Sequence, residues 1–480
     1  MEAIVTPEAG SPTGTRCSSS AVGAVAAGAP SFWLDQLGAR PSRPALDGDR
    51  EADVCIVGGG FTGLWTAYEL RRADPSLEVV VLEARHVGFG ASGRNGGWVL
   101  GALSGSAAAW RARGGADGPR AMVRAIQATV AEVGAAVRRE AIECDWEHGG
   151  SLVVAQSETQ LARLRTRAAD ERRDWGEDLA WSLLDQRELE SRVAVHGGRG
   201  ALYTPHCARV QPAALVHGLA TAAERAGAVV YEGTPVTAMT PGEVQCQSGR
   251  VRARYVLRAT EGYTADLAGQ HRVLLPMNSA MIITEPLDQS VWAQLGWAAA
   301  ETLLDGSHLY TYSQRTADGR IAIGGRGVPY RFGSRTDREG PVPAQTVTEL
   351  RDRLLSLFPS LSGVTVGRGW HGVLGVSRDW CPTVGLDRAS GIGFAGGYAG
   401  EGVAASNLAA RTLRDLVLGR DSELTRLPWV GRPARDWEPE PLRFLGARGI
   451  YSLYRLADRR ELVRGRASPL GRLADRLSGR

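Results

Sequence analysis

The spacing of apolar residues changes between residues 54 and 70, and the change predicts a strand, a turn and a helix in succession. Residues 54–57 form a short apolar run that is typical of a buried parallel strand. Gly58, Gly60 and Gly63 come next, and apolar side chains then recur at helical spacing over residues 64–70. The pattern indicates a glycine turn that leads from a buried strand into a helix.

This turn has the spacing of a dinucleotide-binding site. Gly58 permits the tight turn, Gly60 lets the backbone approach a pyrophosphate, and Gly63 lets the helix pack close to the strand. A second strand is expected at 77–82, and it ends on Glu83, about 20 residues after Gly63, where an acid accepts a ribose hydroxyl. A chance glycine turn is the alternative, but it does not account for strand, helix, second strand and acid in register.

The remaining pattern predicts an α/β protein in which two domains are interleaved. Residues 31–37 suggest a short helix anchored by Trp33. Further helices are expected at 118–144, 159–175, 211–226 and 403–418, and strands at 151–155, 229–231, 236–239, 251–257, 273–285, 307–313, 320–326 and 391–395.

We therefore expect a discontinuous nucleotide domain that flanks two inserted segments. The predicted boundaries are a flexible arm at 1–30, a nucleotide domain at 31–105, 195–270 and 365–425, a substrate domain at 106–194 and 271–364, and an arginine-rich extension at 426–480. The last part, 451–480, is expected to be a solvated amphipathic helix or a segment that docks on a membrane or a partner.

Composition narrows the function classes. The chain has 480 residues, 43% of them hydrophobic, and no apolar run approaches the ~18 residues of a membrane span. The N-terminus is a poor signal peptide, so we expect a cytoplasmic protein without stable membrane insertion. Six cysteines show no CxxC pair and no ligand spacing, so no metal site is indicated. The net charge of +4 is small and spread along the chain, which does not imply nucleic acid.

Two more glycine-dense stretches carry candidate chemistry. The first, GASGRNGG at 90–97, is a mobile surface loop or a backbone strip lying against a ligand, with Arg94 and Asn95 as its polar contacts. The second, GGYAGEG at 396–402, precedes a helix whose positive end would favour negative charge on a bound ligand. A plain turn before a surface helix is the alternative for the second stretch.

Together with WHG at 370–372 and DWCPTVG at 379–385, these motifs resemble the D-amino-acid oxidase, glycine oxidase and sarcosine oxidase superfamily of FAD enzymes, and GASGRNGG is most similar to its gamma-glutamylputrescine oxidase branch. The resemblance implies a GR-type Rossmann FAD-binding domain with an interleaved substrate domain of the α+β type, built on an antiparallel sheet. It implies that FAD contacts Gly58, Gly60, Phe61, Thr62, Gly63, Glu83, Ala84, Arg85, Gly90, Ala91, Ser92, Arg94, Asn95, Gly96, Gly97, Val236, Ala259, Thr260, Gly262, Gly397, Tyr398, Gly400, Glu401, Gly402 and Val403.

The implied activity is oxidation of a primary or secondary amine or amino acid to an imine, which hydrolyses to an aldehyde or keto acid, while O2 is reduced to H2O2. This reaction needs hydride-transfer geometry and exclusion of water, and neither a metal nor a nucleophile. The alternatives are a flavin amine dehydrogenase that passes electrons to a protein or quinone acceptor, a non-catalytic flavoprotein, and, for the glycine turn alone, a nicotinamide dehydrogenase.

Candidate catalytic residues come from the inserted sheet and the loops expected to face the flavin. Tyr310 and Tyr312 would share one face of a strand, and a tyrosine with Arg326 or Arg378 would clamp a substrate carboxylate. Each residue also has a plainer interpretation, as a packing tyrosine or a surface charge.

The chain contains no lysine, whereas sarcosine-oxidase relatives use one to help oxygen accept an electron. The substitute charge would come from Arg94, Arg326, Arg378 or His371; without it, the protein would act as a dehydrogenase. Non-covalent FAD is expected, because the sarcosine-type cysteine would fall near Gly372 and Cys381 lies too far along.

Overall fold

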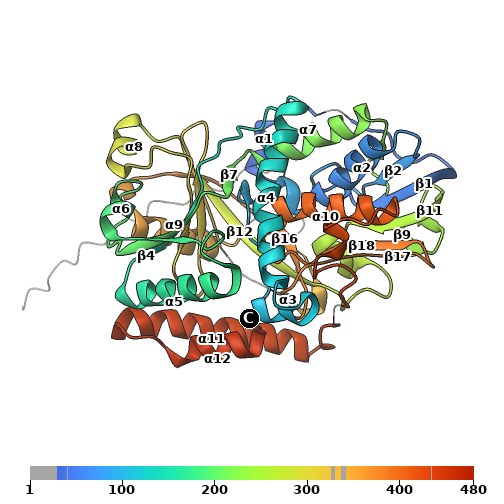
Figure 1. Ribbon diagram of the computed structural model, residues 1–480. Coiled ribbons are helices and arrows are strands. Elements are labelled where there is room, and N and C mark those ends of the chain that lie inside the picture. Colours follow the sequence, from blue (N-terminus) through green and yellow to red (C-terminus); the bar gives the residue numbers. More distant parts are fainter. Residues whose placement is uncertain (1–29, 41, 326–329, 337–341, 434, 480) are drawn as a thin grey trace, which may run out of the picture.

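The computed structural model describes residues 30–40, 42–325, 330–336, 342–433 and 435–479 (Figure 1). The predicted arm, apart from residue 30, and Arg326 lie outside the described residues. Two large sheets and a two-stranded sheet organise the chain.

The first sheet is built around the predicted nucleotide-binding strand. Its strands β1, β2, β8, β11 and β18 are parallel, and β17 joins β18 in antiparallel fashion. The order across the sheet is β17 (Thr383–Asp387), β18 (Ile392–Gly396), β11 (Arg250–Arg258), β1 (Arg50–Val57), β2 (Val79–Leu82) and β8 (Val229–Tyr231).

Side chains of β1 alternate between two cores because the sheet is covered on both faces. Val54 and Ile56 pack on the helical side, whereas Cys55 and Val57 pack against an antiparallel hairpin. The hairpin is β9 (Val236–Thr240) with β10 (Glu243–Cys246), and the helical layer is α2 (Phe61–Ala73), α4 (Gly118–Arg139), α7 (Pro212–Arg225) and α10 (Gly402–Val417).

The second sheet is largely antiparallel and stands beside the first (Figure 1). Its order is β16 (Val366–Val376), β12 (Leu275–Thr284), β15 (Ile321–Gly325), β14 (Tyr312–Arg315), β13 (Thr302–Asp305), β4 (Ser151–Ala155), β6 (Gly200–Thr204) and β5 (Ser182–Leu184). All ten residues of β12 are buried, because helices and loops cover both faces of this strand. Ile282 faces α9 (Ala344–Leu357), whereas Met281 and Ile283 pack against Trp33 and Trp370.

The smaller elements complete these layers. Trp33 lies in α1 (Phe32–Gln36) and is buried, as predicted. The others are β3 (Trp98–Leu100) paired with β7 (Cys207–Arg209), α3 (Ala107–Gly114), α5 (Glu158–Trp175), α6 (Gln186–Glu190) and α8 (Gln289–Leu295).

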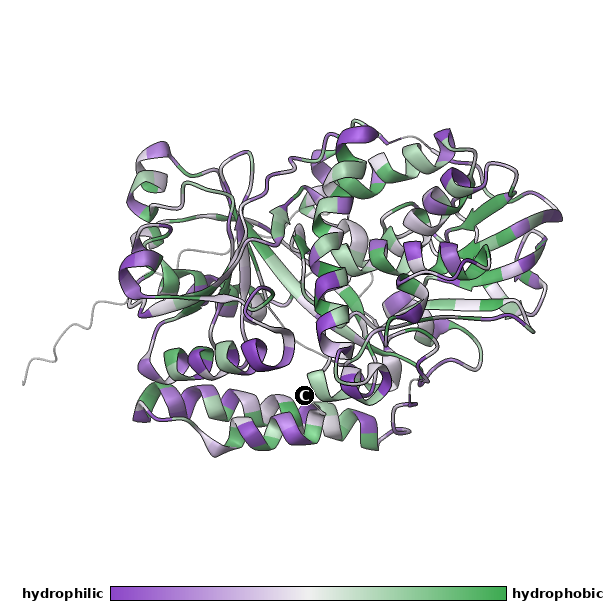
Figure 2. Cartoon of the chain, in the orientation of Figure 1, coloured by the Kyte–Doolittle hydropathy of each residue, from purple (hydrophilic) through white to green (hydrophobic). Residues whose placement is uncertain are grey.

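The C-terminal extension forms two helices, α11 (Leu442–Arg464) and α12 (Pro469–Ser478), instead of the single helix expected. They lie side by side along one edge of the molecule, beneath α5 in the view of Figure 1. Hydrophilic and hydrophobic residues alternate along both helices (Figure 2). Among the described residues, no helix is long and apolar enough to cross a membrane.

The interleaved α/β architecture is confirmed, but the strand expected at 307–313 is wrong for most of its length. Only β14, from Tyr312, is a strand. The Asp305 carboxylate accepts hydrogen bonds from the backbone N–H groups of Ser307 (2.9 Å) and Thr311 (2.8 Å), and it therefore closes the intervening residues into a loop.

The domain boundaries stay a prediction, and the pairing differs from them in places. β6 and β16 belong to the second sheet, although the predicted boundaries assign them to the nucleotide domain. Conversely, α4 packs in the core of the first sheet.

Candidate active site

A cavity of about 430 Å³ runs between the two sheets. It starts at the glycine turn between β1 and α2, passes the loop at 89–96 and the start of α10, and ends at residues of the second sheet. All the predicted cofactor residues line it except Gly63, Gly97 and Gly397. The sequence motifs, which are hundreds of residues apart, therefore converge on one space.

The glycine turn has the close contacts that only glycine allows. Gly58 has a φ of +118°, and a Cβ there would lie 2.5 Å from the carbonyl oxygen of Ala259. A Cβ on Gly63 would lie 2.0 Å from the carbonyl oxygen of Gly58, so Gly63 holds the helix against the turn, as predicted. Gly60 is the N-cap of α2, and a Cβ there would meet the Ser92 hydroxyl at 2.9 Å. The Phe61 N–H donates to the same hydroxyl at 2.8 Å, and the start of α2 lines the cavity, where its positive end favours an anion.

Glu83 stands at the end of β2 beside this turn. Its carboxylate accepts hydrogen bonds from the N–H groups of Gly59 (2.8 Å) and Arg85 (2.9 Å). Burial raises the pKa of Glu83, although these N–H groups favour its charged form. The carboxylate lines the cavity, where it can accept a ribose hydroxyl.

Asn95 orders the GASGRNGG loop. Its side chain donates to the carbonyls of Ala91 (3.1 Å) and Ser92 (2.8 Å) and accepts from the N–H of Gly97 (2.7 Å). The indole of Trp33 donates to the Asn95 carbonyl at 2.9 Å. The loop is therefore a hydrogen-bonded wall of the cavity.

Arg94 brings a buried positive charge to the same wall. The side chain is 2% exposed and stacks over the Phe89 ring at 4.4 Å. Its guanidinium donates to the carbonyls of Phe89 (2.7 Å) and His371 (3.3 Å). These two carbonyls hold the guanidinium in place at the cavity wall.

The start of α10 closes the cavity beside the glycine turn. Gly402 is the first residue of α10, so the positive end of this helix faces the cavity, as predicted. The hydroxyls of Tyr398 and Thr62 share a hydrogen bond of 3.1 Å, which ties this segment to α2.

Glu261, which the sequence did not indicate as a functional residue, ties the same segment to β16. It lines the cavity and accepts from the N–H groups of Tyr398 (2.9 Å) and Gly375 (2.6 Å). Burial raises its pKa to about 7 against these favourable bonds. No spacing rule points to it, because its partners lie more than a hundred residues away. A local signal is its position three residues after β11, which ends at Arg258.

The far end of the cavity belongs to the second sheet and is lined by Ser279, Leu304, Tyr310 and Tyr312. The Tyr312 hydroxyl lies 2.9 Å from the Ser279 hydroxyl, and its ring stands edge-on to Trp98 with centroids 6.0 Å apart. Both predicted tyrosines reach the cavity, but Tyr310 does so from the loop after β13 and not from a shared strand face.

Of the other predicted catalytic residues, the two that the structure describes, His371 and Arg378, do not line the cavity. The imidazole of His371 lines a separate small cavity with Asn278 and Arg331. Arg378 pairs with Glu438 at 2.9 Å, and Arg326 lies outside the described residues. Of the five described cysteines none lines the cavity; Cys381 is buried in the first core.

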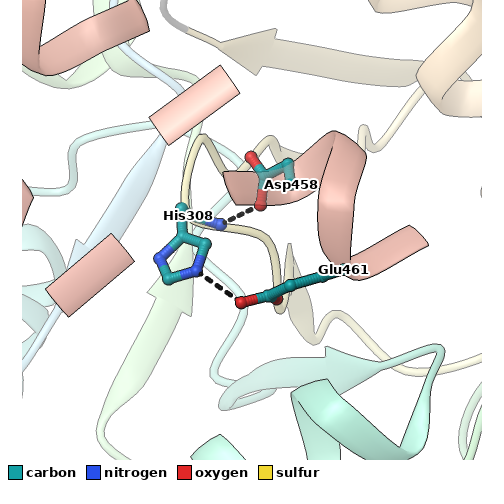
Figure 3. Close-up of side chains that lie close together, drawn as sticks. All are labelled: His308, Asp458 and Glu461. Atoms are coloured by element: carbon teal, nitrogen blue, oxygen red, sulfur yellow. Dashed lines mark hydrogen bonds and ion pairs between the residues drawn. The ribbon is translucent and has the colours of Figure 1, made fainter. Parts of the chain in front are cut away.

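A cluster of His308, Asp458 and Glu461 has the composition of a metal site (Figure 3). Asp458 accepts from the backbone N–H of His308 at 2.9 Å, and the imidazole Nε2 lies 3.0 Å from Glu461. The guanidinium of Arg163 lies 2.9 Å from Glu461 and 3.2 Å from the same imidazole. Arg163 therefore supplies the cation of this cluster, which fastens α11 to the loop that carries Tyr310.

The glycine turn, the acid at the end of β2 and the second sheet across the cavity define a dinucleotide-binding oxidoreductase fold. Residues 53–416 match the family model described as FAD dependent oxidoreductase, and the chain belongs to this family. The cofactor is accordingly FAD, and the start of α2 at the cavity, Glu83 and the close-packed glycines fit its dinucleotide half.

Known proteins support the same assignment. The chain is 32% identical to gamma-glutamylputrescine oxidoreductase of Escherichia coli K12 over 84% of this chain and 92% of the relative. The structure resembles glycine oxidase from Geobacillus kaustophilus (TM-score 0.65, 21% identity, 78% of this chain and 96% of the other). It also resembles L-proline dehydrogenase from P. horikoshii (TM-score 0.63, 18% identity, 79% and 98%). The superfamily expected from the motifs is confirmed.

Proposed function

We propose that the protein oxidises the C–N bond of a primary or secondary amine or amino acid to an imine, which hydrolyses to an aldehyde or keto acid, with O2 reduced to H2O2. The observation that carries the proposal is the single cavity that joins the dinucleotide site to Tyr310 and Tyr312. The similarity to an E. coli enzyme named for an amine supports an amine substrate.

Bound FAD would supply the hydride acceptor, and the side chains of the protein would orient the substrate and exclude water. Leu304, Trp98 and the two tyrosines give the substrate end of the cavity apolar walls, which exclude water from a neutral amine. The paired hydroxyls of Tyr312 and Ser279 offer a donor and an acceptor to a substrate nitrogen or carboxylate. A carboxylate clamp through Arg378 is not supported, since that side chain is paired with Glu438.

Of the predicted cations that the structure describes, Arg94 lines the cavity. We expect its buried guanidinium to stabilise the negative charge that would develop on O2 during its reduction in this cavity. Non-covalent FAD is supported by the absence of a cysteine among the described residues that line the cavity.

A flavin dehydrogenase is the second candidate. The absence of lysine from the sequence favours it, because the residue that relatives use for oxygen is missing. The likeness to L-proline dehydrogenase shows that this fold also occurs in a protein named as a dehydrogenase.

The test is a steady-state assay of the purified yellow protein with polyamines, gamma-glutamyl amines, N-methyl amino acids and D-amino acids, read as peroxide. Peroxide formed with one class supports the oxidase. Substrate-dependent dye reduction without peroxide supports the dehydrogenase. Full FAD occupancy with neither product indicates a non-catalytic flavoprotein, and a colourless protein contradicts the FAD assignment.

Matched variants locate the substrate end. Tyr312→Phe removes the hydrogen bond to Ser279, and we expect kcat/KM to fall about ten-fold while FAD content is unchanged. Tyr231→Phe makes the same chemical change on β8, outside the cavity, and should leave both values unchanged. An equal fall of kcat/KM in the two variants would contradict the placement of the substrate beside Tyr312.

A further inference from the structure

The helix pair formed by α11 and α12 carries an unusual surface. Among the described residues, the large apolar side chains that are exposed lie on this pair, apart from Phe332; they are Leu442, Leu445, Leu456, Leu462, Val463, Leu473 and Leu477. Leu462 and Val463 are 88% and 83% exposed. The same two helices and their connection expose eight arginines, which are Arg448, Arg455, Arg459, Arg460, Arg464, Arg466, Arg472 and Arg476.

The apolar and basic residues form stripes along the helices. Leu445, Leu456 and Val463 are 11 and 7 residues apart, which places them on one face of α11. Arg459 and Arg460 flank that face. On α12, Leu473 and Leu477 are one turn apart, beside Arg472 and Arg476. This arrangement is an amphipathic surface with a basic border.

The acidic side chains of the pair are turned inward. Within residues 442–479, all of which the structure describes, the acids are Asp458, Glu461 and Asp475, and none is exposed. Asp458 and Glu461 bind the loop at 308–309, and Asp475 accepts a hydrogen bond from the Tyr454 hydroxyl at 2.7 Å. The exposed charge of the pair is therefore positive. Among the described residues, Arg455 alone of the eight arginines has an acid within ion-pair reach, Glu349 at 4.0 Å.

The pair is firmly attached to the body, so its outer face has a fixed orientation. The Trp380 indole donates to the Ser478 carbonyl at 3.1 Å, and the Tyr454 ring stacks on His308 with centroids 5.8 Å apart. Arg163 of α5 binds Glu461 at 2.9 Å.

We propose that this face docks on the surface of an anionic phospholipid membrane. Exposed leucines between arginines match a bilayer surface, into which the apolar side chains insert while the guanidinium groups meet lipid phosphates. Charge complementarity selects this occupant. In a symmetric dimer the same face would oppose its own arginines, and nucleic acid would leave the leucines in water. The inference does not depend on which amine is oxidised.

The experiment is co-sedimentation of the full-length holoenzyme with vesicles of phosphatidylglycerol and phosphatidylcholine, compared with pure phosphatidylcholine vesicles. We expect binding to the anionic vesicles that is lost in 0.5 M salt, a condition chosen because it shortens the Debye length to about 4 Å. Equal binding to both kinds of vesicle, or to neither, would overturn the proposal.

Two sets of variants test the two halves of the face. Arg459→Gln, Arg460→Gln and Arg464→Gln together should weaken partitioning about a hundred-fold, since each basic residue near an anionic surface contributes about five-fold. Leu445→Ser, Leu456→Ser and Val463→Ser together should also reduce binding by at least about ten-fold, because the apolar insertion is lost. All six side chains are exposed, so thermal unfolding and FAD content should stay unchanged.

The control removes three exposed arginines elsewhere. Arg50→Gln, Arg252→Gln and Arg254→Gln lie on the first sheet, away from the helix pair, and should bind vesicles as the wild type does. If this control lost as much vesicle binding as the triple arginine variant of the helix pair, the proposal would be overturned, because net charge alone would then explain binding. A concentration-dependent dimer abolished by the leucine variants, or tighter binding to duplex DNA than to the vesicles, would overturn it as well.

Discussion

The closest approach at the glycine turn gives a sharp prediction for Gly63→Ala. In the middle of an unconstrained helix, replacing glycine by alanine stabilises the folded protein by about 0.5–1 kcal/mol. Here the new Cβ would lie 2.0 Å from the carbonyl oxygen of Gly58 and 3.2 Å from the Ile56 side chain. The first contact is with backbone, which cannot rotate away, so the turn and α2 must separate. Overpacking of this kind costs about 1–3 kcal/mol, and the shift also moves the N–H groups that face the cavity.

We therefore expect Gly63→Ala to lower the midpoint of thermal unfolding and to reduce the FAD content of the purified protein, read from its absorbance at about 450 nm. Gly449→Ala is the matched control, because Gly449 also lies inside a helix, α11, and a Cβ there meets nothing within 4 Å. The control should keep its FAD and unfold at the same or a slightly higher temperature. A Gly63→Ala protein with wild-type FAD content and stability would refute the close packing of this turn.

Further changes probe the other parts of the site. The pKa of Glu261 is raised from 4.5 to about 7, so between these pH values the folded chain retains a proton that the unfolded chain releases. The free energy of unfolding should therefore fall as the pH rises from about 5 to 7. Glu261→Gln should remove this pH dependence in thermal melts. Glu461→Ala breaks the contact to His308, so it should lower the free energy of unfolding by about 2–3 kcal/mol and raise KM by loosening the Tyr310 loop. Leu462→Ala removes a side chain that is 88% exposed and should change neither quantity. A denaturant titration and steady-state kinetics measure the two quantities. For an oxidase, Arg94→Gln should slow reoxidation of the reduced protein by O2 about ten-fold or more in stopped flow, and Arg94→Lys should restore part of the rate; an unchanged Arg94→Gln rate would remove Arg94 from the account. Acid precipitation should leave all FAD in the supernatant, and a yellow pellet would contradict non-covalent binding.

The dinucleotide half of the site could be predicted because its determinants are local. Gly58, Gly60 and Gly63 act through backbone geometry, and their spacing alone specifies the contacts that the structure shows. The helix at 402–417 and the acid at Glu83 follow from neighbouring pattern in the same way.

The substrate half could be predicted only in part, because its determinants are tertiary. Tyr310 reaches the cavity from a loop that is closed by a hydrogen bond to the Asp305 side chain. The apolar pattern of the sequence does not predict such a hydrogen bond. His371 lies in β16, which the sequence pattern does not predict as a strand, and it lines the separate small cavity because the direction of its side chain depends on how β16 pairs with β12. Arg378 is paired with Glu438, sixty residues later in the chain.

The most direct test of the account is an anaerobic titration of the purified protein with the amine panel, followed by flavin absorbance. The account predicts that at least one amine or amino acid bleaches the absorbance near 450 nm, and that Tyr312→Phe bleaches more slowly at the same FAD content. A protein that binds FAD fully and is bleached by none of the amines, while dithionite still reduces it, would contradict the proposed amine oxidation.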